Sequence, residues 1–415
     1  MALLHHFLSR LIKHGTLTVV DFAGATHCYG KPSPDFPNVT MRLNDDKAGR
    51  DIVLHPNLGF VEGYMDGRIS IDDDDIMGLV TLAKGNNPWE KRKNLERMGA
   101  AKNIAKTAIK RVKQANFRAA SKQNVAHHYD LSGALYDLFL DKDRQYSCAY
   151  WAQPGEDIDL SAGLDQAQED KKAHIAAKLY LKPGMTVLDI GCGWGGMALY
   201  LHRKYGVRVT GITLSEEQLA VARQRAQDEG VADHVTFELI DYRDLQGQFD
   251  RIVSVGMFEH VGVPYYREFF RQCHNLLKPD GVMLLHTIGR MGSPGMTDAF
   301  TRKYIFPGGY IPALSEILQG SEPNRLMVTD VEALRLHYGM TTRAWYNRVR
   351  EKRAEIEVLY DARFFRMWSL YLAGATAAFE NGGMLIYQLQ YTRDRHALPI
   401  TRDYMLEEEA RLRGE

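Results

Sequence analysis

The strongest constraint on the fold is a regular alternation of apolar strand-like runs and helical runs that begins at Thr186. Strands are expected at the runs TVLDIG, VRVTGIT, VTFELID, FDRIVSVG and GVMLLHTIG, and helices over 197–204, 216–229 and 265–277. Strands that alternate with helices are joined by right-handed crossovers and form a mostly parallel sheet with helices on both faces. We therefore expect an α/β fold built on a Rossmann-like sheet.

The first part of the chain has a different pattern. β-branched runs at 16–22, 39–43 and 51–54 are separated by turn residues, and a helical pattern begins at Asp73. We interpret this part as a smaller α+β domain, because a chain of 415 residues has room for two domains. The predicted division is an N-terminal domain over 1–90, a basic helical linker over 91–123 and a catalytic domain over 124–415.

Composition excludes several classes of function. Lys plus Arg equals Asp plus Glu at 52 residues each, so the net charge gives no reason to expect a nucleic-acid partner. The four cysteines lack CxxC spacing, which argues against a disulfide framework and a zinc site, and no metal site is expected. No run of about 18 apolar residues is present, and the first residues lack a secretory pattern. A cytoplasmic location is therefore expected.

Two segments have patterns that suit a membrane surface. Between Lys84 and Lys122 there are twelve Lys and Arg residues but only two Glu residues. A helix of this kind docks on anionic lipid, at about 1 kcal/mol per basic residue, although a solvated helix between domains has the same pattern. Apolar residues near the N-terminus recur at helical spacing and are expected to insert shallowly into a membrane: Leu3, Leu4, Phe7, Leu8, Leu11 and Ile12.

A glycine-rich loop, DIGCGWGG, begins at Asp189 directly after the first strand of the expected parallel sheet. A dinucleotide fingerprint places a pyrophosphate there, whereas this loop offers a carboxylate, which suits the cationic groups of S-adenosylmethionine. Thr213 and Gln218 follow the second strand and are placed to reach ribose hydroxyls, and Asp241 and Tyr242 follow the third and suit an adenine ring. A plain strand-to-helix turn explains the loop alone but not three matching strand ends.

Several motifs together resemble the cyclopropane-fatty-acyl-phospholipid synthases. They are HYDLSGALYDLFLDKDRQYSCAYW, DIGCGWGG, GITLSEEQ, FDRIVSVGMFEHVG, LHTIG and KYIFPGGYIP. A weaker resemblance to the family's N-terminal lipid-binding domain lies in NLGFVEGYMDGRISID. The resemblance implies transfer of a methylene group from S-adenosylmethionine to the cis double bond of an unsaturated acyl chain in a membrane phospholipid. It also implies peripheral association with the anionic inner face of the membrane, and a homodimer is expected.

The family resemblance further implies a bound bicarbonate, which serves as the base that removes a proton from a carbocation. Carried over by motif, the ligands of that anion are Glu259, His286, Cys148, Tyr338 and the backbone of Ile288. A thiol, an imidazole and a phenol all donate to an oxyanion, and Glu259 accepts from the bicarbonate hydroxyl. Without the resemblance, His286 at the end of an apolar strand is equally well a satisfied core histidine.

The strand ends, the loop and the resemblance together define a set of expected cofactor-binding residues. They are Tyr146, Ser147, Asp189, Gly191, Gly193, Thr213, Leu214, Gln218, Asp241 and Tyr242. One position departs from the family: Ala375 stands where relatives often have a cysteine that has been proposed to be catalytic. Alanine is neither a nucleophile nor a base, and because the bicarbonate ligands are all present, we interpret this position as a packing position.

Two alternatives to ring formation remain open at this stage. A related C-methyltransferase leaves a methyl branch or a methylene group on the acyl chain, and the sequence does not distinguish these products. A catalytically inactive lipid-binding homologue is a different class, and the complete set of base-site residues argues against it. The preferred head group and the position of the double bond are also not specified by the sequence.

Overall fold

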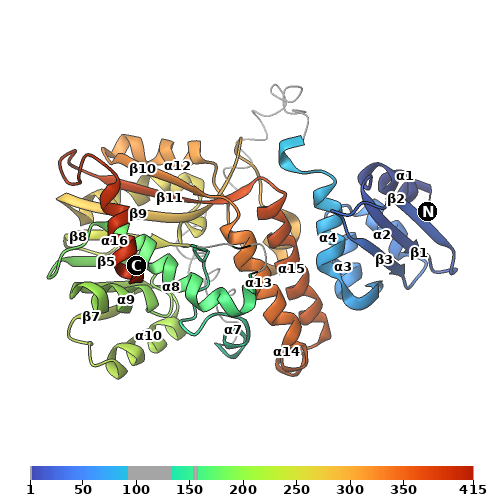
Figure 1. Cartoon of the computed structure of the whole chain (residues 1–415), viewed down its shortest axis with the longest axis horizontal. Coiled ribbons are helices and arrows are strands. Elements are labelled where there is room, and N and C mark those ends of the chain that lie inside the picture. Colours follow the sequence, from blue (N-terminus) through green and yellow to red (C-terminus); the bar gives the residue numbers. More distant parts are fainter. Residues whose placement is uncertain (1, 92–132, 153–154, 156–157, 415) are drawn as a thin grey trace. The chain divides into compact units, whose positions relative to one another are not determined.

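The computed structural model describes residues 2–91, 133–152, 155 and 158–414 (Figure 1). The described residues form two compact units, which are treated separately below. Most of the predicted basic helix lies outside the described residues, so its docking role stays a prediction. Among the described helices, none combines the length and the apolar character that a bilayer crossing requires.

The larger unit contains a sheet of seven strands in the order β10-β11-β9-β8-β5-β6-β7. The five strands from β9 to β7 are parallel, as predicted. Their bounds are β5 (Thr186–Ile190), β6 (Arg208–Thr213), β7 (Val235–Leu239), β8 (Phe249–Val255) and β9 (Leu277–Arg290). The other two strands, β10 (Met327–Leu334) and β11 (Met384–Thr392), extend the sheet in antiparallel fashion and were not predicted.

Helices cover both faces of this sheet (Figure 1). Along β5, Val187 belongs to one core and Leu188 to the other, which is the alternation expected of a strand that is buried on both faces. One face carries α8 (Leu160–Leu179), α9 (Gly196–Tyr205), α10 (Glu216–Asp228) and α16 (Asp403–Arg413). The other carries α11 (Tyr266–Leu276) and α12 (Leu314–Ser321). The predicted α/β class and the three crossover helices are confirmed.

The smaller unit is built on a mixed sheet in the order β2-β1-β3-β4, in which β1 and β3 are parallel and the other pairs are antiparallel. Its strands are β1 (Gly15–Val20), β2 (Thr26–Lys31), β3 (Asn38–Leu43) and β4 (Ile69–Ile71). Its helices are α1 (Ala2–Leu11), α2 (Ala48–Leu54), α3 (Gly59–Met65) and α4 (Ile76–Gly85), joined by α14 (Arg353–Leu359) and α15 (Ala362–Glu380) from much later in the chain. This mixture of strands and helices agrees with the predicted α+β class.

Each of the two units is built from several separate segments of the chain, whereas the predicted domains are continuous. Residues 298–305 and 339–383, which were expected in the catalytic domain, belong to the smaller unit. The reason is that α15 packs against α3 and α4. The larger unit keeps α7 (Gly133–Phe139), and α13 (His337–Glu351) begins in it and continues into the smaller unit. Short single turns complete the description, at 72–74, 89–91, 258–260, 263–265, 301–305 and 322–324.

One predicted strand is wrong, because residues 51–54 are the second half of α2. Asp45 starts this helix by accepting hydrogen bonds from the backbone N–H groups of Lys47 and Ala48, at 2.8 and 2.7 Å. Arg68 then bonds both Asp45 and Asp51. A side-chain oxygen that satisfies the free N–H groups of a helix start favours helix over strand here.

Candidate active site

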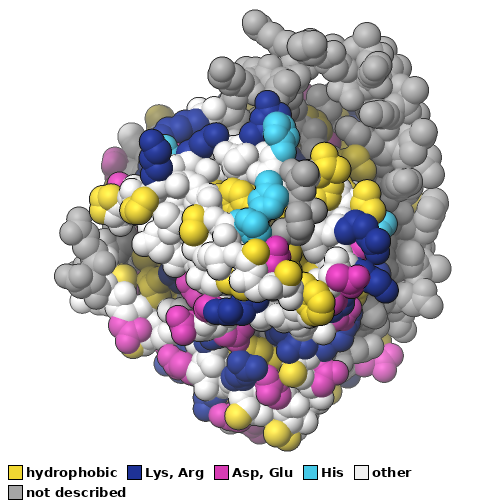
Figure 2. Space-filling view, turned by 90° about the vertical axis from the view of Figure 1, so that its right-hand side faces the viewer, with side chains coloured by type: hydrophobic (Ala, Val, Ile, Leu, Met, Phe, Trp, Pro, Cys, Tyr) yellow, Lys and Arg dark blue, Asp and Glu magenta, His cyan; other side chains and the backbone are white. Residues whose placement is uncertain are grey.

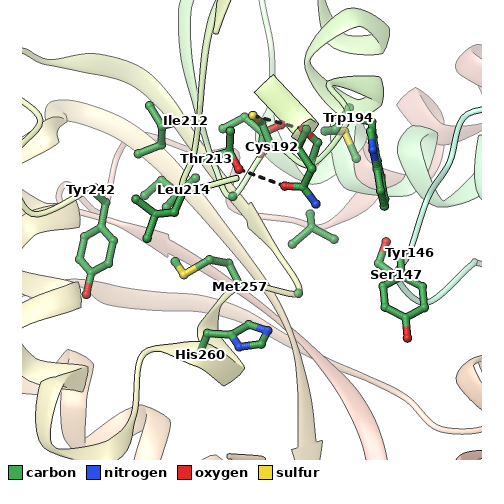
Figure 3. Close-up of a pocket in the computed structure, with 18 of the residues that line it drawn as sticks. Tyr146, Ser147, Cys192, Trp194, Ile212, Thr213, Leu214, Tyr242, Met257 and His260 are labelled. Carbon is green, nitrogen blue, oxygen red and sulfur yellow. Dashed lines mark hydrogen bonds between the residues drawn. The ribbon is translucent and has the colours of Figure 1, made fainter. Parts of the chain in front are cut away.

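A cavity opens at the carboxyl ends of β5, β6 and β8, and it lies wholly within the larger unit (Figure 3). The chain order reverses between β5 and β8, and open α/β sheets bind ligands at such a point. Figure 3 shows Tyr146 and Ser147 on one side of the cavity and Leu214 and Tyr242 on the other. All ten expected cofactor-binding residues line it: Tyr146, Ser147, Asp189, Gly191, Gly193, Thr213, Leu214, Gln218, Asp241 and Tyr242.

The glycine-rich loop can pass close to its neighbours only because glycine occupies the positions of closest approach. Gly191 has a φ of 82°, and a Cβ there would lie 2.8 Å from the Cβ of Met257. Gly195 has a φ of 84° at the start of α9, and a Cβ would lie 2.7 Å from the ring of Phe237. Both the positive φ and the close approach exclude larger residues. The loop therefore holds its backbone against the cavity floor.

Asp189 is the last polar side chain of β5 and is 2% exposed. Its Oδ2 atom has no hydrogen-bond partner within the described part of the chain. Burial raises the pKa of Asp189 to about 7, and the charge of Lys171 partly opposes this rise. A buried carboxyl group without a partner is rare unless a ligand supplies one. This atom therefore fits a ligand that brings a positive charge or a donor, as S-adenosylmethionine does.

The end of the cavity where an adenine ring is expected contains a contact that was not predicted. Asp241 already accepts two hydrogen bonds from the Arg243 guanidinium, at 2.8 and 2.5 Å. Arg243 also lines the cavity and was not named in the sequence analysis. The ring of Tyr242 is fixed edge-on against Phe269, with the centroids 5.3 Å apart. Arg243 therefore orients the Asp241 carboxylate, and Phe269 orients the aromatic ring beside it.

Other cavity residues were missed because only three strand ends were considered. Met257 and His260 follow β8, the fourth strand, and line the cavity together with Trp194. Burial lowers the pKa of His260 to about 4, so its ring is neutral near pH 7. A neutral imidazole adds no positive charge beside a cationic ligand. The strand-end rule, applied to β8, would have identified both residues.

A second polar group lies where β8 and β9 end. Glu259 is 7% exposed, and its Oε1 atom accepts a hydrogen bond from the backbone N–H of Ile288 at 2.5 Å. Its Oε2 atom is buried and has no partner among the described residues. Burial raises the pKa of Glu259 to about 7, and the N–H of Ile288 opposes this rise. The backbone N–H of Ile288 was expected to bind the anion, but in this structure it donates to Glu259.

His286 lies two residues before Ile288 on β9, so the two side chains point to the same face of the sheet. It is 1% exposed, and its Nδ1 atom lies 3.1 Å from Nε2 of Gln388 on β11. Its Nε2 atom is buried without a partner in the described residues. Burial lowers the pKa of His286 well below its usual value, and nearby lysines add to this. The ring is therefore neutral and is not a satisfied core histidine.

The remaining two expected anion ligands are also buried. Cys148 directly follows Ser147 of the cavity wall and is 1% exposed. Tyr338 lies in the first turn of α13 and is 8% exposed. The structure thus joins Glu259 to Ile288 by a hydrogen bond, while the joint role of all five ligands stays a prediction. Ala375 lies on α15 of the smaller unit and is half-buried.

Residues 117–389, more than half of the chain, match the family model described as Mycolic acid cyclopropane synthetase. The chain belongs to this family. A cyclopropane-fatty-acyl-phospholipid synthase from Escherichia coli (strain K12) is 39% identical over 359 residues, which cover 85% of this chain and 87% of that protein. A probable fatty acid methyltransferase from Pseudomonas putida is 41% identical over 293 residues, 68% of this chain and 73% of that protein.

A solved structure agrees with this assignment. The mycolic acid cyclopropane synthase CmaA1, complexed with SAH and CTAB, has a TM-score of 0.61 and 34% sequence identity. The similarity covers 65% of this chain and 97% of that one. The expected family and the expected enzyme class, a methyltransferase that uses S-adenosylmethionine, are therefore confirmed.

Proposed function

We propose that this enzyme adds a methylene group from S-adenosylmethionine to the cis double bond of an unsaturated acyl chain in a membrane phospholipid, forming a cyclopropane ring. The name of the E. coli relative, a cyclopropane-fatty-acyl-phospholipid synthase, supports a phospholipid substrate. One observation carries the proposal: Glu259 and His286 each bury an unpaired polar atom close to the end of β9. A protein that only bound lipid would have no use for such a group.

Different residues of the cavity bind different parts of the methyl donor. S-adenosylmethionine supplies the methyl group. Asp189 accepts from its cationic part, Thr213 and Gln218 serve the ribose, and Tyr242 covers the adenine. Thr213 and Gln218 already share a hydrogen bond of 3.0 Å, so their polar atoms face the same region. The neutral ring of His260 adds no positive charge that would repel the cationic donor.

Ring closure requires removal of one proton. In the transfer, the alkene π pair forms one C–C bond to the methyl carbon, the bond between that carbon and the sulfonium sulfur breaks with release of S-adenosylhomocysteine, and a positive charge remains on the other alkene carbon. A C–H bond of the new methyl then breaks, its electron pair closes the ring, and the proton passes to a base. Bicarbonate supplies that base. Its holders would be Glu259, His286, Cys148 and Tyr338, with Ile288 fixing Glu259. Their burial excludes water that would otherwise quench the cation.

The decisive test is incubation of the protein with S-adenosylmethionine and vesicles that contain a monounsaturated phospholipid. We expect lipid mass spectrometry to show a gain of one CH2 per double bond, with the fragmentation pattern of a cyclopropane. We also expect the rate to fall in degassed, bicarbonate-free buffer and to recover when bicarbonate is added. Unchanged lipid would refute the enzymatic proposal, whereas a rate that ignores bicarbonate would refute only the anion.

A methyl-branched or methylene product is the second candidate. The relative from P. putida, a probable fatty acid methyltransferase, favours it. Both products use the same cavity and the same first cation. Loss of a proton from a neighbouring chain carbon leaves a methyl-branched alkene, whereas a methylene group forms when a hydride first shifts to the cationic carbon and the new methyl then loses its proton. The fragmentation pattern in the experiment above separates the two.

Restoring cysteine at Ala375 tests whether that position takes part in the chemistry. The residue is half-buried on α15 beside Thr376, whose hydroxyl is already bonded to the carbonyl of Leu372. A small thiol there has only a packing role. We expect Ala375→Cys to change turnover by less than about threefold, measured with the same vesicles. A large gain, or a switch of product, would show that the position controls the reaction.

A further part of the proposal is that the enzyme docks on the cytoplasmic membrane surface. Helix α1 forms as predicted, but its apolar residues divide between two faces. Leu4, Leu8 and Ile12 are buried in the smaller unit, so the expectation that all six insert is wrong. Leu3 and Phe7 are 69% and 52% exposed. Figure 2 shows hydrophobic side chains beside histidines and basic residues on this face.

The exposed pair provides a direct test of docking. We expect the double substitution Leu3→Ser and Phe7→Ser to lower the affinity for anionic phospholipid vesicles by about tenfold or more, since burial of each side chain is worth about 1.5–3 kcal/mol. Vesicle co-sedimentation measures this. Ile400→Ser, at a fully exposed apolar residue of the larger unit, is the control and should bind as the parent does. Equal binding by both variants would remove α1 from the docking surface.

A further inference from the structure

Helix α8 carries a row of polar side chains that are buried rather than solvated. Gln168, Lys171, His174 and Lys178 recur at intervals of three or four residues and are each at most 6% exposed. Such spacing places them along one side of the helix. Burying these groups is unfavourable unless each has a partner. The mechanism above uses none of them, so their partners indicate what the row does.

The partners of this row belong to segments that carry site residues. The Gln168 amide donates to the backbone carbonyls of Gln145 and Ser147, at 3.2 and 3.0 Å. Lys171 donates to the hydroxyl of Ser147 at 3.0 Å. Both contacts hold the segment that leads into Cys148. The last member, Lys178, instead reaches across to β11.

The contact of Lys178 fixes the orientation of the Gln388 amide. The Nζ atom of Lys178 lies 2.7 Å from Oε1 of Gln388 and also forms an ion pair with Glu332. A lysine ammonium only donates, so the atom facing it must be the amide oxygen. The Gln388 NH2 group therefore points the other way, where it lies 3.1 Å from Nδ1 of His286. Reversing the amide would place two donors against each other.

The orientation of the amide determines the proton on the imidazole. An NH2 group only donates, so Nδ1 of His286 must accept and carries no proton. The ring is neutral, because burial lowers its pKa well below the usual value. A neutral ring holds one proton, which then resides on Nε2. That is the buried atom which has no partner among the described residues.

We infer that Lys178 and Gln388 are positioning residues that hold His286 as the Nε2–H tautomer, so that it presents a hydrogen-bond donor to a bound oxyanion. The identity of that anion as bicarbonate rests on the proposed function, but the tautomer does not. The opposite tautomer would present a lone pair and repel an anion. A partner that selects the tautomer of a functional histidine is a recurring device in active sites.

The neighbours of Lys178 hold the chain of contacts from Lys178 through Gln388 to His286, which we call the relay, in one arrangement. Glu332 also accepts from Nε2 of His174 at 2.7 Å, and Nδ1 of His174 lies 2.9 Å from Glu409. Glu332 is held ionised, since the hydrogen bond from His174 and the charge of Lys178 lower its pKa despite burial. The carboxylate of Glu332 therefore holds the ammonium of Lys178, and His174 holds that carboxylate. These contacts keep the ammonium directed at Gln388.

The tautomer is measurable by NMR on the whole protein labelled with 15N-histidine, with the His286→Gln variant used to assign the signal. In the parent we expect the nitrogen shifts of an unprotonated Nδ1 and a protonated Nε2. Gln388→Glu replaces the donor by an acceptor, and we expect the proton to move to Nδ1. Gln390→Glu is the matched control, because Gln390 lies on the same strand and donates to the backbone carbonyl of Lys178 and to the hydroxyl of Tyr404 but not to His286.

Activity and binding provide the second readout. Gln388→Glu should lower kcat at least tenfold and raise the bicarbonate concentration needed for half-maximal rate, with the affinity for S-adenosylmethionine unchanged. Lys178→Met should act in the same direction. A parent protein with the proton on Nδ1, or a Gln388→Glu variant with unaltered tautomer or kcat, would overturn the inference. The expected tautomers with a rate indifferent to bicarbonate would support the relay and contradict the proposed anion.

Discussion

Replacing Glu259 by Gln or His286 by Ala is expected to lower turnover by two or more orders of magnitude while the affinity for S-adenosylmethionine changes by less than about threefold. A positioned base or its anchor typically contributes about 10²- to 10⁴-fold to a rate. Neither residue lines the cofactor cavity, and each buries an unpaired polar atom. Calorimetric titration with the cofactor and initial rates on lipid vesicles measure the two effects separately.

The matched control for this pair is His274→Ala. His274 is a partly buried histidine on α11 that is not among the expected site residues, so its variant should keep both turnover and cofactor affinity. Thermal melting checks that all variants fold. A parallel loss of turnover and cofactor affinity in the Glu259 and His286 variants would show that these residues belong to the cofactor pocket and not to a separate base site.

The cavity at the strand ends was predictable because each of its parts is local in sequence. A buried strand, a glycine loop and a helix follow one another within about twenty residues, and parallel strands bring their carboxyl ends to one edge. Knowing that Asp189, Thr213 and Tyr242 lie at or just beyond the carboxyl ends of three such strands was enough to place them in one cavity. His260 was missed only because the fourth strand end was not read in the same way.

The parts that escaped prediction depend on distant partners. β11 pairs with β9 across about one hundred residues, and this pairing alone places Gln388 opposite His286. The burial of Lys178 on α8 depends on the same strand, 210 residues away. A polar helix with no apolar stripe is expected to lie in solvent, but the polar row of α8 is buried. On α1 the spacing identified the helix correctly but did not show that Leu4 and Leu8 face the core.

The second large effect is expected at Asp189, where Asn preserves the shape and removes the charge. Hydrogen bonds to charged groups are worth about 1.5–3 kcal/mol, so Asp189→Asn should weaken S-adenosylmethionine binding by about 10- to 150-fold. The affinity for S-adenosylmethionine should also depend on pH, and the pKa of Asp189 gives the direction. Burial raises the pKa of Asp189 to about 7, so the free protein is partly protonated near neutrality and must release that proton to bind a cation. Parent affinity should rise from pH 5.5 to 8, whereas the variant's should stay flat.

The same burial has an opposite consequence for stability, which separates this prediction from simple misfolding. A carboxyl whose pKa is raised from 3.8 to about 7 contributes stability that is present below its unfolded pKa and is lost as the pH rises through about 7. At pH 8 the cofactor-free parent therefore carries a buried charge that the variant lacks. We expect Asp189→Asn to be more stable than the parent at pH 8, by a free energy of unfolding on the order of a few kcal/mol and with a higher melting temperature, and to match the parent at pH 4. A residue that weakens the free protein in order to bind its ligand shows this combination. If the variant loses affinity and melting temperature together at pH 8, the carboxylate is a structural group and the cation-binding role is wrong.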